Sequence, residues 1–286
     1  MNSKVRIELR VLLWICSSLS LVNSPLAKAN AIIVPNYMAN EYGANNVAPF
    51  DIAAIYDSSM RYQEMFDASQ FGNVVAGGEY ITQIAFRAGS LDGPFTASIQ
   101  NIQFDLTTTA NTSLSLTFAD NVGADDTTVF SGSWSFSSAG AAPGRQPAGG
   151  PAPAIFDIVL NLTTPFFYNP ANGNLVLDLR NFSGGQTAYF DAAFQSNPSG
   201  AVISSVWAGD AAATSTSSGQ SAAVGPVAQF TFRPNPVPEP SAMGLELTCL
   251  GFLLTWRFSK TSRNGMRGHI QESSLSISEQ TNANMG

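Results

Sequence analysis

Between its two ends the chain alternates apolar and polar residues with a period of two. Such alternation places apolar side chains on one face of a β-sheet and polar side chains on the other. Residues 58–71 could also hold a helical turn, but we favour a strand there. The clearest alternating runs are residues 102–106, 114–118, 156–162, 175–179 and 230–232. The pattern predicts short β-strands through the central part of the chain.

Turn-forming residues separate these runs. Gly, Asn and Pro adopt the backbone conformations of tight turns, and they recur at 91–94, 121–123, 172–174, 183–185 and 197–200. Short strands between such turns are typical of an all-β fold, and we expect an antiparallel β-sandwich of the jelly-roll type. Two low-complexity stretches, 139–153 and 209–225, are predicted to be loops, the second a flexible loop before the last strand.

The first 31 residues are predicted to be a signal peptide with a short apolar helix. Basic residues precede an apolar stretch at 11–22, and Ala29 and Ala31 end possible A-x-A cleavage sites. The apolar stretch is about 12 residues long, whereas a membrane-spanning helix needs roughly 20. A permanent membrane anchor is the alternative interpretation.

A second processing signal is predicted near the C-terminus. An extended, proline-containing motif is accessible to a processing enzyme because proline prevents helix and sheet pairing, and it consists of Pro238, Glu239 and Pro240. A single hydrophobic helix at 242–256 follows, and then a basic cluster that stays on the cytoplasmic side, formed by Arg257, Lys260 and Arg263. A Pro-rich linker before a peripheral helix is the alternative.

This order of motif, apolar helix and basic end resembles the PEP-CTERM sorting signal. The resemblance implies that an exosortase recognises the motif and removes the tail, and that the protein is released or attached at the cell surface of a bacterium that makes exopolysaccharide. Segments at 60–63, 81–87, 118–123 and 164–175 are similar to uncharacterised exported proteins with this tail. That similarity implies an extracellular β-domain and no particular activity.

These signals divide the chain into a signal peptide at 1–31, a β-sandwich domain at 32–236, a sorting signal at 237–267 and a polar disordered tail at 268–286. Both cysteines and the only histidine lie outside the domain, at Cys16, Cys249 and His269. The domain is therefore expected to fold without disulfides. It also lacks the groups for Ser-His-Asp or Cys-His catalysis and for imidazole zinc sites.

Charge is sparse in the predicted domain, with five arginines, no lysine and 15 acids, a net charge of about −10. Such a surface repels phosphate backbones, which argues against a nucleic-acid partner. Acids on the polar faces of strands, such as Asp105, Asp157 and Asp178, are expected in solvent. Glycoside hydrolysis needs two acids facing each other across roughly 5–9.5 Å, and no motif here identifies such a pair.

Residues 120–127 are the best candidate for a metal site. Asp120, Asp125 and Asp126 bring hard oxygen ligands into a loop with a glycine, which suits a structural Ca²⁺ ion with six to eight oxygen ligands. A solvated turn whose side chains cap their own backbone is the alternative. We expect no other cofactor.

Four aromatic residues are candidates for a sugar-stacking platform, with core packing as the alternative for each: Trp134, Trp207, Tyr168 and Tyr189. Trp134 shares a strand face with Phe136, which favours the core. Trp207 lies beside the second low-complexity stretch and is the better candidate for exposure.

Together these observations predict an exported, non-catalytic protein of the cell surface or extracellular matrix, with a binding or structural role associated with exopolysaccharide or biofilm. Signal peptidase and exosortase are its expected processing partners, and its C-terminal helix is expected to sit in the inner membrane before cleavage. The alternatives are a lectin-like carbohydrate-binding module with a calcium-stabilised loop, and a secreted hydrolase.

Overall fold

Strands and short 3-10 helices make up the described part of the chain, which in the computed structural model is residues 29–50, 59–140, 155–185, 188–195, 201–216 and 223–234. These residues all belong to one compact unit, Ala27–Asn235. The strands are β1 (Asn30–Val34), β2 (Ala44–Asn46), β3 (Met60–Phe66), β4 (Glu79–Phe86), β5 (Phe95–Thr109), β6 (Thr127–Ser138), β7 (Ile158–Tyr168), β8 (Asn174–Asn181), β9 (Phe190–Phe194), β10 (Ile203–Ala208), β11 (Val224–Pro226) and β12 (Ala228–Pro234). The 3-10 helices are η1 (Asn36–Asn40), η3 (Ala68–Phe71), η4 (Phe118–Asn121) and η5 (Pro170–Asn172).

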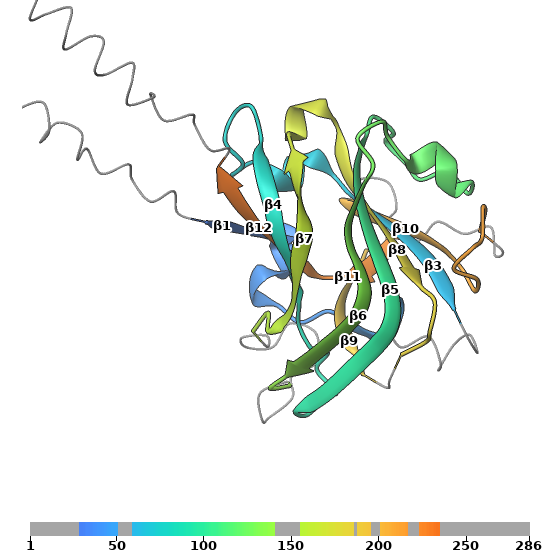
Figure 1. The fold of residues 1–286 in the computed structure, drawn as a ribbon. Helices are drawn as coiled ribbons and strands as arrows, with labels where there is room; N and C mark the ends of the chain where they lie inside the picture. Colours follow the sequence, from blue (N-terminus) through green and yellow to red (C-terminus); the bar gives the residue numbers. More distant parts are fainter. Residues whose placement is uncertain are drawn as a thin grey trace, which may run out of the picture. The chain divides into compact units, whose positions relative to one another are not determined.

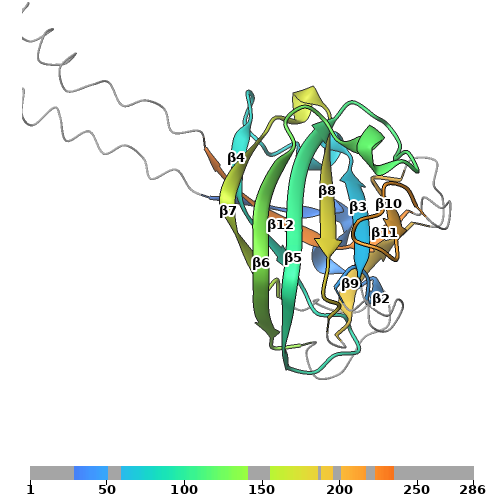
Figure 2. The same ribbon diagram turned by 45° about the vertical axis from the view of Figure 1, so that its right-hand side comes forward.

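The strands form three sheets in which all paired strands are antiparallel. One sheet has four strands in the order β1-β12-β4-β7, the second has five in the order β10-β3-β8-β5-β6, and the third has three in the order β11-β9-β2. Figures 1 and 2 show the two larger sheets as separate layers. The all-β, antiparallel class predicted from the alternation is confirmed.

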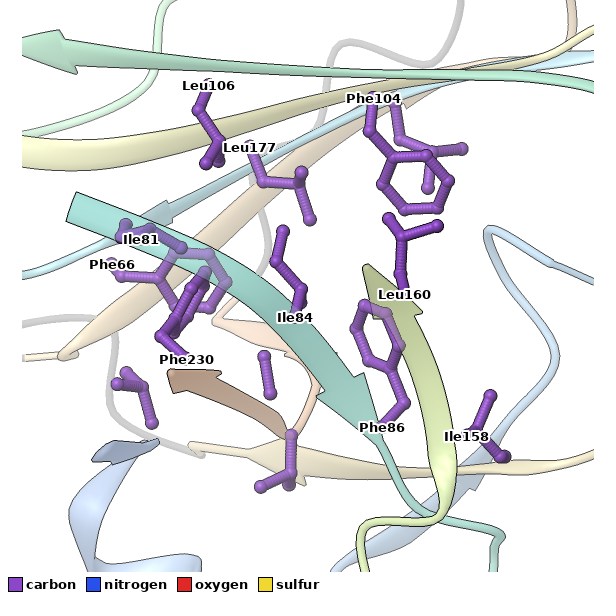
Figure 3. Packing of buried hydrophobic residues seen from close by; sticks show 14 of the residues in the cluster. Phe66, Ile81, Ile84, Phe86, Phe104, Leu106, Ile158, Leu160, Leu177 and Phe230 are labelled. Carbon is purple, nitrogen blue, oxygen red and sulfur yellow. The ribbon is translucent and has the colours of Figure 1, made fainter. Parts of the chain in front are cut away.

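The hydrophobic core lies between the two larger sheets. Ile84 and Phe86 of β4 and Leu160 of β7 come from one layer, and Phe104 and Leu177 from the other (Figure 3). Each fully buried side chain of this kind stabilises the fold by about 1.5–3 kcal/mol relative to an exposed one. The described strands contain no cysteine, so this burial replaces disulfides as the source of stability.

An aromatic cluster fills one end of the core. The ring of Phe50 lies 4.9 Å from that of Phe86, 5.5 Å from that of Trp134 and 4.4 Å from that of Phe190, measured between centroids. The indole N–H of Trp134 donates to the carbonyl of Val159 at 3.3 Å, which links β6 of one sheet to β7 of the other. The interior is thus filled by side chains at this end.

Four of the predicted runs overlap strands β5, β7, β8 and β12, and residues 58–71 contain β3 followed by η3. The prediction of a strand at 114–118 is wrong, because these residues form no strand and lead into η4. Its apolar residues Leu114 and Phe118 are buried in a small cluster with Met65 and Val176, on the side of the five-stranded sheet away from the core. The alternation predicted the burial of these side chains correctly, but it predicted the wrong backbone conformation.

The second low-complexity stretch, 209–225, was predicted to be a flexible loop, and its described residues differ from that prediction. Within 209–225, residues 209–216 pack on the five-stranded sheet and β11 pairs with β9. The Phe118 N–H donates to the Thr214 carbonyl at 3.0 Å, and the Thr216 N–H donates to the Leu116 carbonyl at 2.9 Å. These bonds hold residues 209–216 in place rather than leaving a flexible loop.

A helix long and apolar enough to cross a membrane is not found among the described residues. The predicted apolar helices at 11–22 and 242–256 both lie outside that part of the chain.

Candidate functional site

A layer of polar and charged side chains covers the outer face of the five-stranded sheet. Strand register arranges it in two cross-strand rows, one formed by Arg61, Arg180 and Gln103 and the next by Gln63, Asp178 and Asp105. We call these six residues the polar layer. Two segments, residues 111–126 and 210–216, lie over it, and we call them the roof.

The centre of the polar layer is an ion pair between Arg61 of β3 and Asp178 of β8. The Arg61 Nε donates to Asp178 Oδ1 at 3.1 Å, and Arg61 Nη2 donates to Oδ2. Gln63 Nε2 donates to the same carboxylate at 2.8 Å. The guanidinium lies 4.7 Å from the ring centroid of Phe118, and its Nη1 donates to the Ala213 carbonyl at 3.0 Å. Charge-assisted, two-point bonding of this kind fixes geometry strongly, so the pair connects the sheet to both parts of the roof.

Asn121 attaches η4 to the polar layer. Its Nδ2 donates to Gln63 Oε1 at 2.8 Å and to the Ser115 carbonyl at 2.9 Å, and its Oδ1 accepts from the Ser115 N–H at 2.7 Å. The side chain is fully buried. A buried amide with its bonding groups satisfied rigidifies its surroundings, which here means the turn that contains η4.

Two further carboxylates lie near Asp178. Asp105 is its direct cross-strand partner and accepts from Gln103 Nε2 at 2.8 Å and from the Thr128 hydroxyl. Burial raises the pKa of Asp126, and the negative charges of Asp105 and Asp178 raise it further, against the opposing effect of nearby arginines. The neighbouring acids therefore make loss of a proton less favourable at Asp126 than at an isolated aspartate.

The expectation that Asp105 and Asp178 lie in solvent is wrong. Their side chains are buried, with only 4% and 2% of the residue exposed, because the roof covers the polar side of the sheet. Asp157 is half-buried, and its carboxylate accepts from the Ala139 N–H at 2.7 Å. No local pattern in the sequence could have shown which strand face would be covered by a distant loop.

The predicted calcium ligands are distributed among different partners. Asp120 accepts from the Ser115 hydroxyl at 2.9 Å, and Asp125 accepts from the Thr107 hydroxyl and the Thr108 N–H at 2.9 and 2.8 Å. Among the described residues, no three His, Cys, Asp or Glu side chains form a group that could hold a metal ion. The calcium site stays a prediction, and the observed bonds are those of a loop stabilised by its own side chains.

Calcium removal provides the test. We expect the same melting temperature in millimolar Ca²⁺ and in EDTA, because hydrogen bonds to protein groups already engage Asp120 and Asp125. Differential scanning calorimetry measures this directly, with Mg²⁺ as the control for ionic strength. A melting temperature that rises with Ca²⁺ alone would instead support the predicted site, since a ligand bound only to the folded state stabilises it.

The predicted aromatic platform is divided between the core and half-buried positions. Trp134 and Tyr168 are buried in the core. Trp207 is half-buried and packs against Met60 and Tyr62, and Tyr189 is half-buried as well. The four side chains therefore do not form one exposed surface.

A second buried ion pair joins Arg87 and Asp191 next to the small sheet. Arg87 Nε donates to Asp191 Oδ2 at 2.7 Å, its Nη2 donates to the carbonyls of Met38 and Glu41, and Asp191 Oδ1 accepts from the Gly43 N–H at 2.7 Å. Both side chains are almost completely buried. Burial raises the pKa of Asp191, while Arg87 and the Gly43 amide oppose that shift.

Glu64 of β3 is a buried acid on the core side of the five-stranded sheet. Its Oε2 accepts from the Tyr62 hydroxyl at 3.4 Å, and its Oε1 has no hydrogen-bond partner among the described residues. The backbone of β11 passes directly over it, because a Cβ placed on Gly225 would lie only 2.0 Å from Oε1. Burial raises the pKa of Glu64 well above its usual value.

The sorting motif Pro238, Glu239 and Pro240 and the basic cluster lie outside the described part of the chain, as does the predicted signal peptide up to residue 28. The last residues of that predicted segment are described, and Asn30 and Ala31 begin β1. Comparison with known proteins adds no relative: no protein-family model, no curated protein and no solved structure matches this chain. Function must therefore be inferred from the residues themselves.

Proposed function

We propose that this chain is an exported, non-catalytic protein with a binding or structural role in an extracellular polysaccharide matrix. Its signal peptide directs export, its C-terminal helix holds it briefly in the inner membrane, and an exosortase acts at Pro238-Glu239-Pro240 to place it at the cell surface or outside the cell. The sequence signals near both ends support this localisation. The hydrogen bonds of the aspartate side chains support a non-catalytic role.

The observation that best supports this proposal is that most of the described aspartates form hydrogen bonds within the fold. Each accepts a hydrogen bond from a backbone N–H or a protein side chain: Asp67, Asp92, Asp105, Asp120, Asp125, Asp157, Asp178, Asp191 and Asp210. A catalytic acid must exchange its proton with a substrate. Carboxylates that fix turns, roofs and buried pairs are poorly suited to that task, which favours a binding or structural protein over a hydrolase.

The domain ends suit a sorted protein. β1 and β12 are neighbouring antiparallel strands, so the start of the first strand lies beside the end of the last. Pro238 follows the last residue of β12 by four positions, at most about 14 Å of extended chain. We infer that the exosortase works close to the folded domain. We also propose the jelly-roll type for the fold, and the change of sheet at most connections of the chain supports it.

Sorting can be tested by replacing Pro238, Glu239 and Pro240 together with alanine. We expect the wild-type protein in the producing bacterium to lose the tail beyond the motif, and the variant to keep it and remain in the membrane fraction. Intact mass spectrometry of each fraction measures both. Pro236→Ala, two residues before the motif, is the control and should be processed normally. Equal processing of the triple variant would contradict the proposed sorting.

A further inference from the structure

The outer face of the four-stranded sheet has a different chemical character from the rest of the domain. Its strands contain only two charged residues, Glu79, which is buried, and Arg233, which is exposed. The predicted domain as a whole has a net charge of about −10. This sheet therefore presents a nearly uncharged surface on an acidic protein.

An aromatic pair lies on that face. Tyr80 of β4 and Phe167 of β7 are cross-strand partners, with ring centroids 5.3 Å apart in an edge-to-face arrangement. Phe167 is 38% exposed, and its Cζ lies where a Cβ on Gly78 would come within 2.7 Å. The absence of a side chain at Gly78 allows the ring to lie against the backbone. Phe167 is therefore held in place although it is exposed.

A hydrogen-bonded row of uncharged polar side chains runs beside the pair. The Thr231 hydroxyl of β12 donates to Gln83 Oε1 of β4 at 3.2 Å, and Gln83 Nε2 donates to Asn161 Oδ1 of β7 at 2.9 Å. The three residues are cross-strand neighbours. Each bond orients the next amide, and the row ends at Asn161, which accepts through its Oδ1 and has an exposed side chain. The row thus offers preoriented donors and acceptors on the same strands as the aromatic pair, with Gln83 three positions along β4 from Tyr80.

We propose that this face, made of Tyr80, Phe167, Gln83, Asn161 and Thr231, binds a neutral polysaccharide chain. A sugar ring has an apolar C–H face that suits an aromatic ring and hydroxyl groups that both donate and accept hydrogen bonds, as the amide row does. The proposed matrix role is the premise of this site. A protein partner is disfavoured, because a stable protein interface needs an apolar centre. Phe167 is the one large apolar side chain that is exposed on the described strands of the four-stranded sheet.

The occupant should be neutral rather than anionic. The acidic domain repels a polyanion over distances of about 8 Å at physiological ionic strength, and Arg233 alone cannot offset this. Arg61 and Arg87, which could otherwise attract an anion, are buried in ion pairs.

Affinity electrophoresis of the full-length protein, in native gels containing mixed-linkage β-glucan, galactomannan, dextran or alginate, tests the proposal. We expect retardation in at least one neutral polysaccharide and none in alginate. Phe167→Ala should weaken binding about tenfold, and Gln83→Ala should weaken it measurably. Matched controls are Phe182→Ala, which removes a ring of similar exposure elsewhere, and Gln100→Ala on β5; both should bind like the wild type.

Two results would overturn the site: no retardation in any neutral gel, whether or not alginate retards the protein, or equal binding by the wild type and Phe167→Ala. Circular dichroism of each variant checks that it is folded, and all four changes are at surface or half-buried positions. Failure of the glycan site would leave the sorting experiment unaffected, because that test measures tail removal rather than binding.

Discussion

Asp191→Ala will lower the free energy of unfolding by about 3–5 kcal/mol, the usual cost of leaving a buried charge without its partner. Arg87 is completely buried, and its guanidinium connects Asp191 to the carbonyls of Met38 and Glu41. Removing the carboxylate therefore leaves an unpaired cation and also removes the acceptor of the Gly43 N–H. Urea denaturation of the purified protein at pH 7, followed by circular dichroism, measures the change.

The double variant Arg87→Met, Asp191→Ala separates the charge from the packing. It should recover part of the loss, because a buried pair can often be replaced by apolar groups at little cost. Ser135→Ala, an exposed position on β6, is the control and should stay within about 0.5 kcal/mol of the wild type. A loss below about 1 kcal/mol in Asp191→Ala, as found for exposed ion pairs, would contradict the buried placement.

Local alternation was sufficient to predict the inner sheet faces. Phe104, Leu177 and Phe230 point into the core because each stands in a run where every second residue is apolar. This signal is contained in a few neighbouring residues, and it therefore survives without knowledge of the rest of the chain. The antiparallel, all-β class could be predicted for the same reason.

The outer faces could not be predicted in this way. Asp178 is buried because Arg61, 117 positions earlier, pairs with it and because a roof from two other segments covers both. The run at 114–118 alternates like a strand, yet it belongs to the roof, where its apolar residues pack against the five-stranded sheet. A polar residue on a strand carries no mark that distinguishes a solvated face from a covered one, so contacts between distant segments decide the outcome.

The proposed glycan face depends on register in the same way. Gln83 lies opposite Thr231 and Asn161 in the same register that pairs Phe86 with Ala228 and Ile158, and both ladders become irregular just beyond this row. A one-residue change in register moves a side chain to the other face of a sheet. The three residues lie up to 148 positions apart, so their common row depends on the pairing of distant strands.

Glu64 gives the domain a dependence of stability on pH. A carboxyl group whose pKa is raised in the folded state keeps its proton there after the unfolded chain has lost it. Stability from this group is therefore fully present below the unfolded pKa of about 4.3, and it is lost as the pH rises toward the folded pKa. Tyr62, the titratable neighbour on the same strand, stays protonated because burial raises its pKa as well.

Glu64→Gln should remove this dependence. Between about pH 5 and the folded pKa of Glu64, we expect the wild type to lose up to about 1.4 kcal/mol of unfolding free energy per pH unit relative to the variant. The amide keeps the shape of the side chain beneath Gly225 but has no proton to lose. The variant should therefore match the wild type near pH 4 and be the more stable protein by pH 8. Urea denaturation across this range provides the comparison, with Glu41→Gln, an exposed acid, as the control. Parallel pH profiles for Glu64→Gln and the wild type would mean that Glu64 ionises in the folded protein as readily as in the unfolded chain, and the raised pKa would be wrong.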